Sequence, residues 1–368
     1  MARSLAIAAC VLGLASWTGP ARAADYAGLF DVELRRSELQ RSDHAQIRQA
    51  CLAIEIDREW AELEPIPGLS STSGYGSDRR ANEFNWAVMV LAGRALAGDG
   101  EAELMLKNLF LEWADAKAFS ETEVSHDSYY ALKRVVLPAV VAFSILEPRV
   151  DAEESAKIAA WLDPLVRRVD RTFDGDVDHN NHRYLADSVL TVWGAIAGDD
   201  DLYAKGLERL KAALEEARRD GSLPLEVRRG SRALWYTRQA LASFAVIAET
   251  ARGRGEDLYA LSVDNRSYWT LFGFLLNGLA VDLLVHSYAA ENYIPGPEID
   301  YRKQDRGFLD TRSNGRHYLA FTEAIVTRSA DLPSAERIRA FVDREAVAER
   351  PLIDEFAGGN ATCFWGAP

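Results

Sequence analysis

The feature that most constrains the fold of this chain is the spacing of its apolar residues, which follows the helical period almost throughout. Between Asp200 and Gly221 the leucines recur at helical spacing with charged residues between them: Leu202, Leu207, Leu210 and Leu214. A capping pattern of Asp151 and Glu154 precedes another periodic run. Runs that alternate apolar and polar residues, which are typical of strands, are almost absent. The sequence therefore predicts an all-α fold.

The periodic segments predict about ten or more antiparallel helices, joined mostly by short turns. We expect helices over 42–63, 84–95, 101–115, 129–146, 151–165, 183–197, 200–221, 231–252, 268–285, 317–329 and 334–347. Pro138 should kink or end its helix, and Gly221 should stop another. Helix hairpins of this kind pack into a single-domain toroid or incomplete barrel with a cleft at its loop ends. Two longer loops, 64–80 and 286–316, are candidates for function.

The first 23 residues are typical of a secretory signal peptide. Arg3 gives a positive start, 5–17 is mostly apolar, and Ala21-Arg22-Ala23 forms a cleavage site. A lipoprotein cleavage box ending at Cys10 is the alternative. The apolar stretch is too short for a bilayer, which needs about 20 residues, and we find no second window suited to an anchor. We expect residues 24–368 to form one domain of a periplasmic or secreted monomer.

Composition and charge exclude several classes of protein. With 48% hydrophobic and 27% charged residues among 368, the chain is neither disordered nor collagen-like. A net charge of −14 argues against non-specific binding of nucleic acid. Cleavage after Ala23 would lower this charge to −16, because two arginines and no acid are lost. A local basic cleft on such an acidic body would still accept a polyanion.

The cysteines leave two alternatives. Cys10 lies in the signal peptide, so that the mature chain would keep Cys51 and Cys363. In an oxidising compartment these two would pair and tie the C-terminal tail to an early helix, or they would remain two thiols. Their spacing is not that of a metal site, and we expect neither a metal nor an organic cofactor.

One polar segment, DHNNHRY at 178–184, lies at the start of an apolar helix. Asn180, Asn181 and His182 would serve there as helix caps, since Asn is favoured at this position and a nearby His often bonds loop backbone. The alternative is that they belong to a functional site. The segment alone does not decide between these two interpretations.

A second segment, DGSLPLEVRRGSRALWY at 220–236, is rich in arginine. Arg229, Arg232 and Tyr236 recur at i, i+3 and i+7, and they share one face if the helix begins by Arg229. A solvated basic stripe with a half-buried tyrosine is the alternative. Taken together, the two segments supply an amide, an imidazole, a guanidinium and a phenol, and this set is more informative than either part.

A reaction that needs such a set is β-elimination from a uronic-acid polysaccharide. The proton at C5 is weakly acidic because the neighbouring carboxylate is already negative. An amide and a guanidinium aimed at the carboxylate oxygens neutralise this charge and stabilise an enolate-like transition state. A base then removes the C5 proton and an acid protonates the leaving O4. Histidine can act as the base, and a phenol beside an arginine can do either job.

The motif Asn180-Asn181-His182, with Arg229 and Tyr236 inside RRGSRALWY and DGSLPLE before them, resembles the alginate lyase family of (α/α) toroid polysaccharide lyases. The resemblance covers most of the chain and is strongest over 174–250. It implies cleavage of a polyuronate, above all mannuronate-rich alginate, to give an unsaturated uronate at the new non-reducing end.

The resemblance also implies roles for single residues. Asn181 and Arg229 would neutralise the carboxylate of the substrate. His182 would assist this neutralisation or act as the base. Tyr236 would be the catalytic acid and, at mannuronate, the base as well.

The loop GYGSDRR resembles the mobile lid of the family, which implies that Tyr75, Arg79 and Arg80 bind substrate. An ordinary turn capped by Asp78 is the alternative. The chain departs from relatives that serve alginate export in two places. It has His179 where they carry a tryptophan, and it lacks their basic residues just before the lid tyrosine. Glucuronan, which related lyases of this fold cut, is therefore an alternative substrate.

Further candidates line the same expected cleft. His126, Tyr129 and Lys133 lie at i, i+3 and i+7, as a sugar subsite or as a partly exposed helix face. Asn180 and Arg232 are also expected to bind substrate. An aromatic and basic loop is suited to stack sugars and pair carboxylates, or is an ordinary surface loop: Tyr288, Tyr293, Tyr301, Arg302, Arg306, Arg312 and Arg316. We expect the arginines at 79–80, 228–232 and 302–316 to converge on one cleft.

Two other classes of protein remain as alternatives. An exported glycoside hydrolase would need two carboxylates flanking the bond, for which Asp174, Asp176 and Asp178 are available. A non-catalytic uronate-binding protein would not depend on the phenolic proton of Tyr236.

Overall fold

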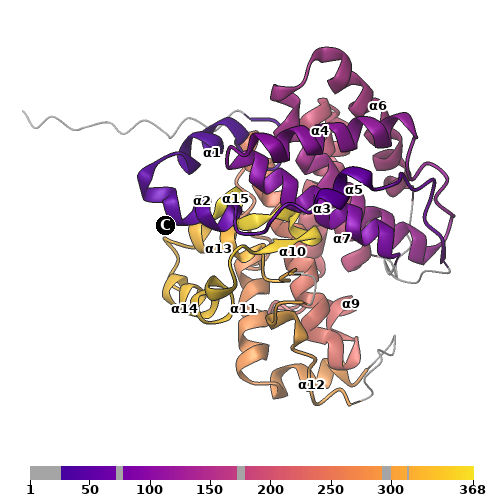
Figure 1. Ribbon diagram of the computed structural model, residues 1–368. Coiled ribbons are helices and arrows are strands. Elements are labelled where there is room, and N and C mark those ends of the chain that lie inside the picture. The colour runs from indigo at the N-terminus through magenta and orange to yellow at the C-terminus, as the bar shows by residue number, and fades with distance from the viewer. Residues whose placement is uncertain (1–25, 72–77, 172–178, 292–299, 313–314) are drawn as a thin grey trace, which may run out of the picture.

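The computed structural model describes residues 26–71, 78–171, 179–291, 300–312 and 315–368 (Figure 1). The predicted signal peptide, Tyr75 of the loop that resembles a lid, Tyr293 and the aspartates at 174–178 lie outside the described residues. In the described parts of the chain the long elements are all helices, and β1 (Ile353–Asp354) and β2 (Gly359–Asn360) form one short antiparallel pair. The predicted all-α fold is confirmed.

The helices follow one another in antiparallel hairpins. Their bounds are α1 Val32–Leu39, α2 Ala45–Cys51, α3 Arg79–Leu96, α4 Gly100–Asp115, α5 His126–Leu146, α6 Ala152–Asp170, α7 Asn181–Ala197, α8 Asp200–Glu216, α9 Pro224–Val227, α10 Ala233–Gly253, α11 Tyr268–Ala280, α12 Leu283–Ala289, α13 Thr322–Arg328, α14 Ala335–Glu345 and α15 Ala361–Trp365. The capping box predicted at Asp151 and Glu154 is present at the start of α6.

The hairpins form two layers. Helices α3, α5, α7 and α10 pack side by side as an inner layer, and α4, α6, α8 and α11 each return along the outside. Burial follows this division, because 17 of the 21 residues of α5 are buried but only 6 of the 19 in α6. An inner helix is therefore buried on most sides, whereas an outer helix buries one stripe. This is the arrangement expected of an incomplete helical toroid.

Pro138 does not end α5, which continues to Leu146. Proline cannot donate to the carbonyl four residues earlier, which belongs to Arg134. That carbonyl instead accepts a hydrogen bond of 3.2 Å from Nδ2 of Asn85 in α3. The neighbouring inner helix thus satisfies the group that the proline leaves open, and the helix continues.

The prediction of one helix over 42–63 was also wrong. Only α2 and two short 3₁₀ turns, Ser42–His44 and Arg58–Glu62, form there. The carbonyls of Leu52 and Ile54 each accept a hydrogen bond of 2.7 Å from Arg94 of α3. A side chain of the toroid thus satisfies backbone groups that would otherwise bond along a helix, and the segment packs as an extended link.

Three further helix ends differ from the prediction. Helix α8 ends at Glu216, and Gly221, with φ of +89°, lies in the following turn, where a Cβ would stand 2.2 Å from the carbonyl oxygen of Thr270. The helix predicted over 268–285 breaks at extended Val281 into α11 and α12. The helix predicted to begin at 317 begins at Thr322.

Helix α5 with the turn that follows it, 126–149, is long and apolar enough to cross a membrane, which the sequence reading did not find. However, 89% of its most apolar window is buried inside the protein. Its hydrophobicity is accounted for by its place in the inner layer, where neighbouring helices cover it on all sides.

The C-terminal hairpin lies against the inner layer. Figure 1 shows the two strands at the centre of the molecule, where β2 packs on α3 and the turn Glu355–Ala357 packs on α5 and α10. The fully buried Glu355 accepts a 2.9 Å hydrogen bond from Nε of Arg134 in α5 and pairs with Nη1 of Arg316 at 2.8 Å. Burial alone would raise the pKa of Glu355, but Arg316 and Arg134 outweigh it and hold the pKa well below the usual range. Glu355 thus stays ionised in the core.

Cys51 and Cys363 form a disulfide between α2 and α15, 312 residues apart in the sequence. Of the two alternatives, pairing is therefore the one realised. Arg35 of α1 reinforces the same junction by donating to the carbonyls of Cys363, Thr362 and Gly366. The bridge joins the two ends of the chain on one side of the toroid.

We predict that reduction of this disulfide, or Cys363→Ser, lowers the free energy of unfolding by about 2–4 kcal/mol, because a very long loop is released in the unfolded state. Thermal unfolding with and without reductant measures the effect. The double variant Cys51→Ser/Cys363→Ser serves as the control, since reductant should not shift its midpoint. An unchanged midpoint for the reduced wild type would contradict the prediction.

We further predict that Glu355→Gln lowers the free energy of unfolding by about 3–5 kcal/mol, because Arg134 and Arg316 are left buried without their carboxylate. Urea denaturation measures it. The control is Glu336→Gln on the exposed face of α14, which should stay within about 0.5 kcal/mol of the wild type. Equal stability of the two variants would refute the role of Glu355.

Candidate active site

The sequence-predicted site residues gather where the inner helices begin. Lys133 of α5 donates from Nζ to the carbonyl of His182 in α7 at 3.1 Å. Gln239 of α10 donates from Nε2 to Oδ1 of Asn181 in α7 at 3.0 Å. The first turn of α7 therefore lies between the N-terminal halves of α5 and α10, at one end of the toroid. The partial positive charges of their N-termini make this end favourable for an anion.

Asn180 and Asn181 have different surroundings. Asn180 is the N-cap of α7, and its Oδ1 accepts a 2.9 Å hydrogen bond from the backbone N–H of His182. The capping interpretation is therefore right for this residue. Asn181 is fully buried, and it donates from its backbone N–H and from Nδ2 to the carboxylate of Glu226, at 2.5 and 2.9 Å. Its carboxamide reaches a substrate only if a neighbouring group moves aside.

Glu226, in α9, is a buried carboxylate directly beside these groups. Burial raises its pKa to about 7, against the opposing effects of Arg229 and of the two hydrogen bonds from Asn181. Glu226 belongs to the run DGSLPLE, and the sequence pattern predicted no role for it. A glutamate directly after two leucines and a proline, in a run predicted to lie near the site, was the available signal.

His182 is a half-buried imidazole at the first turn of α7. Its ring lies 4.6 Å from the ring of Tyr130, between centroids. Burial, and then the positive charges of Lys133 and Arg229, lower its pKa well below the usual value. The ring is therefore neutral at neutral pH. A neutral imidazole can accept a proton, so its environment favours the role of base over that of a cation.

Arg229 and Tyr236 are in contact, although not for the predicted reason. Helix α10 begins at Ala233, so that Arg229 lies before a short 3₁₀ turn, Gly230–Arg232, and not on the same helical face. The turn folds the guanidinium back over the phenol ring, with its central carbon 3.9 Å from the ring centroid. Arg232 instead points to Asp305, 3.5 Å away, and to Trp235.

Tyr130 and Gln239 belong to the same cluster and were missed. Gln239 donates from Nε2 to the hydroxyl of Tyr130 at 3.2 Å as well as to Asn181. Burial raises the pKa of the Tyr130 phenol to about 12, so it keeps its proton. A polar residue three positions after Tyr236 in an apolar helix was the signal for Gln239. Tyr130 was not predicted, because the expected sugar subsite was placed on the neighbouring helix face, which carries Tyr129.

The other predicted substrate-binding residues are less uniform. His126 is exposed, Tyr129 is buried under Arg168, and Lys133 is fully buried beneath His182, so these three do not form an exposed helix face. Arg79 and Arg80 are exposed on the first turn of α3. The side chain of Asp78 caps this helix, with its Oδ1 accepting from Ala81 N–H at 3.0 Å.

The three arginine-rich segments lie side by side. The backbone N–H of Asp305 donates to the carbonyl of Ser231 at 2.7 Å, which joins 302–316 to 228–232. Arg316 donates to the carbonyl of Asn82 at 3.3 Å, which joins 302–316 to the start of α3. Several of the arginines have nearby acids, as in the pairs of Arg228 with Glu291, Arg302 with Asp300 and Arg306 with Asp282. The common basic cleft therefore stays a prediction.

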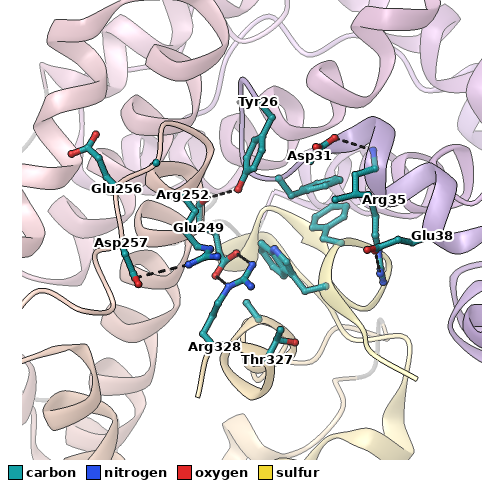
Figure 2. Close-up of a pocket in the computed structure, with 16 residues that line it drawn as sticks. Tyr26, Asp31, Arg35, Glu38, Glu249, Arg252, Glu256, Asp257, Thr327 and Arg328 are labelled. Carbon is teal, nitrogen blue, oxygen red and sulfur yellow. Dashed lines mark hydrogen bonds and ion pairs between the residues drawn. The ribbon is translucent and has the colours of Figure 1, made fainter. Parts of the chain in front are cut away.

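A separate hollow of about 490 Å³ lies at the other end of α10, between this helix, α1, α13 and α15 (Figure 2). Glu249 there binds Arg328 through both oxygens, at 2.9 and 2.8 Å, and Arg252 faces Asp257 at 4.0 Å. Tyr236 is 13 residues before Glu249, or about 20 Å along the helix. The hollow contains none of the predicted site residues, and its arginines are matched by acids.

Among the described residues, no group of three or more histidine, cysteine, aspartate or glutamate side chains is placed to hold a metal ion. The groups that do meet at the helix N-termini are an amide, a neutral imidazole, a guanidinium and a phenol. This set can neutralise a carboxylate and move protons.

Comparisons with known proteins relate the chain to alginate lyases. A sequence model described as alginate lyase matches residues 113–283. A polysaccharide lyase of Stenotrophomonas maltophilia is 34% identical over 152 residues, which cover 40% of this chain and 46% of the relative. An alginate lyase of Pseudomonas aeruginosa is 29% identical over 169 residues, 44% of this chain and 46% of the relative. The matching segments thus span less than half of each relative's length.

Solved structures extend the likeness to nearly the whole fold. Alginate lyase A1-III of Sphingomonas species A1 superposes with a TM-score of 0.75 at 25% identity, covering 97% of this chain and all of the other. A tetrasaccharide complex of alginate lyase A1-III gives a TM-score of 0.76 at 24% identity, with coverage of 94% and 98%. The resemblance noted in the sequence is thus confirmed: the part of the chain at 113–283 matches the alginate lyase model, and the fold is similar to that of the helical toroid alginate lyase A1-III.

Proposed function

We propose that this protein is a polysaccharide lyase that cleaves a polyuronate by β-elimination. The observation that carries the proposal is the meeting of Asn181, His182, Arg229 and Tyr236 where the inner helices begin. These are the residues of the family motif, and they come from two segments about 50 residues apart in the sequence. The named relatives, which are alginate and polysaccharide lyases, support the same reaction.

In the proposed reaction Arg229 and Asn181 bind the carboxylate of the sugar next to the scissile bond. Their donors stabilise the charge that spreads into this group when the C5 proton leaves. Neutral His182 or Tyr236 takes this proton, and the phenol of Tyr236 protonates the departing O4. The C4–O4 bond breaks and a C4–C5 double bond forms, so that no metal or redox partner is needed to balance the step.

Alginate rich in mannuronate is the proposed substrate, on the strength of the alginate lyases among the relatives. Glucuronan is the second candidate, because this chain has His179 at the position where relatives that serve alginate export carry a tryptophan. Both polymers present a carboxylate on C5, so that the same four groups would act on either one.

We propose further that residues 24–368 act as one exported domain, a monomer in the periplasm or outside the cell, after removal of residues 1–23. The disulfide between Cys51 and Cys363 supports this location, since such bonds persist in oxidising compartments. N-terminal sequencing of the exported protein tests the cleavage site, and a start other than Ala24 would contradict it.

The function is tested by incubating the purified protein with polymannuronate, polyguluronate, glucuronan and hyaluronan. We expect new ultraviolet absorbance from the unsaturated product, strongest with polymannuronate. Reducing ends without this absorbance would identify a glycoside hydrolase. Binding without cleavage of any of the four polymers would identify a binding protein, and either result would overturn the proposal.

We predict that Tyr236→Phe lowers kcat by about 100- to 10,000-fold with little change in KM, because the phenolic proton is lost while the ring still packs under Arg229. Initial rates from product absorbance measure both constants. The matched control is Tyr203→Phe, which removes a phenol bonded to Glu256 on the outer layer and should keep the wild-type rate. Full activity of Tyr236→Phe would sink the mechanism.

A further inference from the structure

The carboxamide of Asn181 is held from two sides by buried groups. Glu226 accepts from its Nδ2 at 2.9 Å, and Gln239 donates to its Oδ1 at 3.0 Å. Glu226 also accepts from the backbone N–H of Asn181 at 2.5 Å, and Gln239 is held in turn by the hydroxyl of Tyr130. Glu226, Asn181, Gln239 and Tyr130 are therefore parts of one hydrogen-bonded chain.

An ionised carboxylate can only accept hydrogen bonds, so it forces the Nδ2 end of Asn181 toward Glu226 and the Oδ1 end toward Gln239. This leaves the second Nδ2 hydrogen for the carboxylate of a substrate once a neighbouring group has moved aside. A protonated Glu226 removes the constraint, because its hydroxyl can donate to Oδ1. The amides of Asn181 and Gln239 can then reverse together, with Tyr130 donating to the oxygen of Gln239.

We propose that Glu226 is the positioning residue of this active site, and that its ionised form sets the direction of the Asn181 carboxamide required for β-elimination. The inference rests on the proposed lyase function and deepens it, because it adds a residue that acts through Asn181 without touching the substrate. Gln239 relays the same constraint toward Tyr130 and the ring of His182.

The surroundings of Glu226 make its protonation matter near neutral pH. Burial raises its pKa to about 7, while Arg229 opposes this increase, and the other ionisable group facing it is the buried phenol of Tyr184 in α7. Helices α10 and α12 also pack on α9. Gln239 of α10 is connected to Glu226 through Asn181, and His286 of α12 is bonded to the carbonyl of Arg302. Glu226 is thus ionised above pH 7 and protonated below it, and activity should fall as the pH falls through about 7.

The test is the pH dependence of kcat for wild type and Glu226→Gln, a variant of the same shape that cannot ionise. We expect kcat at pH 8 to fall about 10- to 100-fold, with a much smaller change in KM, because the transition state depends more on orientation than the ground state does. The acid limb near pH 7 should disappear in the variant. Wild-type kcat and an unchanged pH profile in Glu226→Gln would overturn the proposal.

Two further measurements separate positioning from a general loss of structure. In an Asn181→Ala background, Glu226→Gln should change kcat less than about twofold, since the residue through which it acts is gone. Additive effects of the two substitutions would refute the proposal. The matched control is Glu249→Gln, which removes another buried carboxylate from a site at the far end of α10 and should keep the acid limb.

Stability gives an independent readout. The folded-state pKa of Glu226 is raised above its ordinary value, so this group favours the folded state at low pH and loses that contribution as the pH rises through about 7. Glu226→Gln should therefore unfold at pH 8 at a temperature equal to or above that of the wild type. A lower unfolding temperature, with activity lost in proportion to the unfolded fraction, would show a structural role instead.

Failure of the proposed function would be recognised separately, by a wild-type protein that cleaves none of the four polymers. In that case the backbone amide of Asn181 still reports on Glu226 by NMR. Its chemical shift should titrate with a midpoint near pH 7 in the wild type and stay constant in Glu226→Gln. An Asn181 signal that does not titrate in the wild type would overturn the inference in either case.

Discussion

A carboxylate in the core joins parts of this protein that are far apart in the sequence. Glu355, on the C-terminal hairpin, binds Arg134 of the inner layer and Arg316 at the end of the basic segment 302–316. Arg316 reaches on to the first turn of α3. The last residues of the chain are therefore required to fix both the inner layer and the segment beside the candidate site.

The arrangement explains how an acidic protein can offer a site to a polyanion. The net charge of −14 is a property of the whole chain, whereas the site brings the positive charges of Lys133 and Arg229 close to His182 at the start of α7. Among the groups bonded to Asn181, Glu226 is the one acid, and burial raises its pKa to about 7. Local placement, and not overall charge, decides which ligand this end attracts.

Helical periodicity predicted the outer helices because burial repeats along them, as in α4 and α6. It failed where a distant side chain satisfies the backbone, as Arg94 does for Leu52. The motif residues were predicted because they lie close together within two short segments of the sequence. Gln239 and Tyr130, which are linked to Asn181 by hydrogen bonds, were not predicted, since hydrogen bonds between helices produce no periodic pattern in the sequence.

The position of Glu226 shows what the site requires of the fold. A buried carboxylate is destabilising when it is ionised, and the charge of Arg229 with the two hydrogen bonds from Asn181 only partly offsets this, as the raised pKa of Glu226 shows. Glutamine would fill the same space without the charge, but it would not distinguish the two ends of the Asn181 amide. Ionised Glu226 therefore destabilises the folded state at the same pH at which it orients Asn181. A residue with both effects is best explained by a role in function. Structural acids such as Glu355 have the opposite property, since their arginines hold the pKa low and make the charge stabilising.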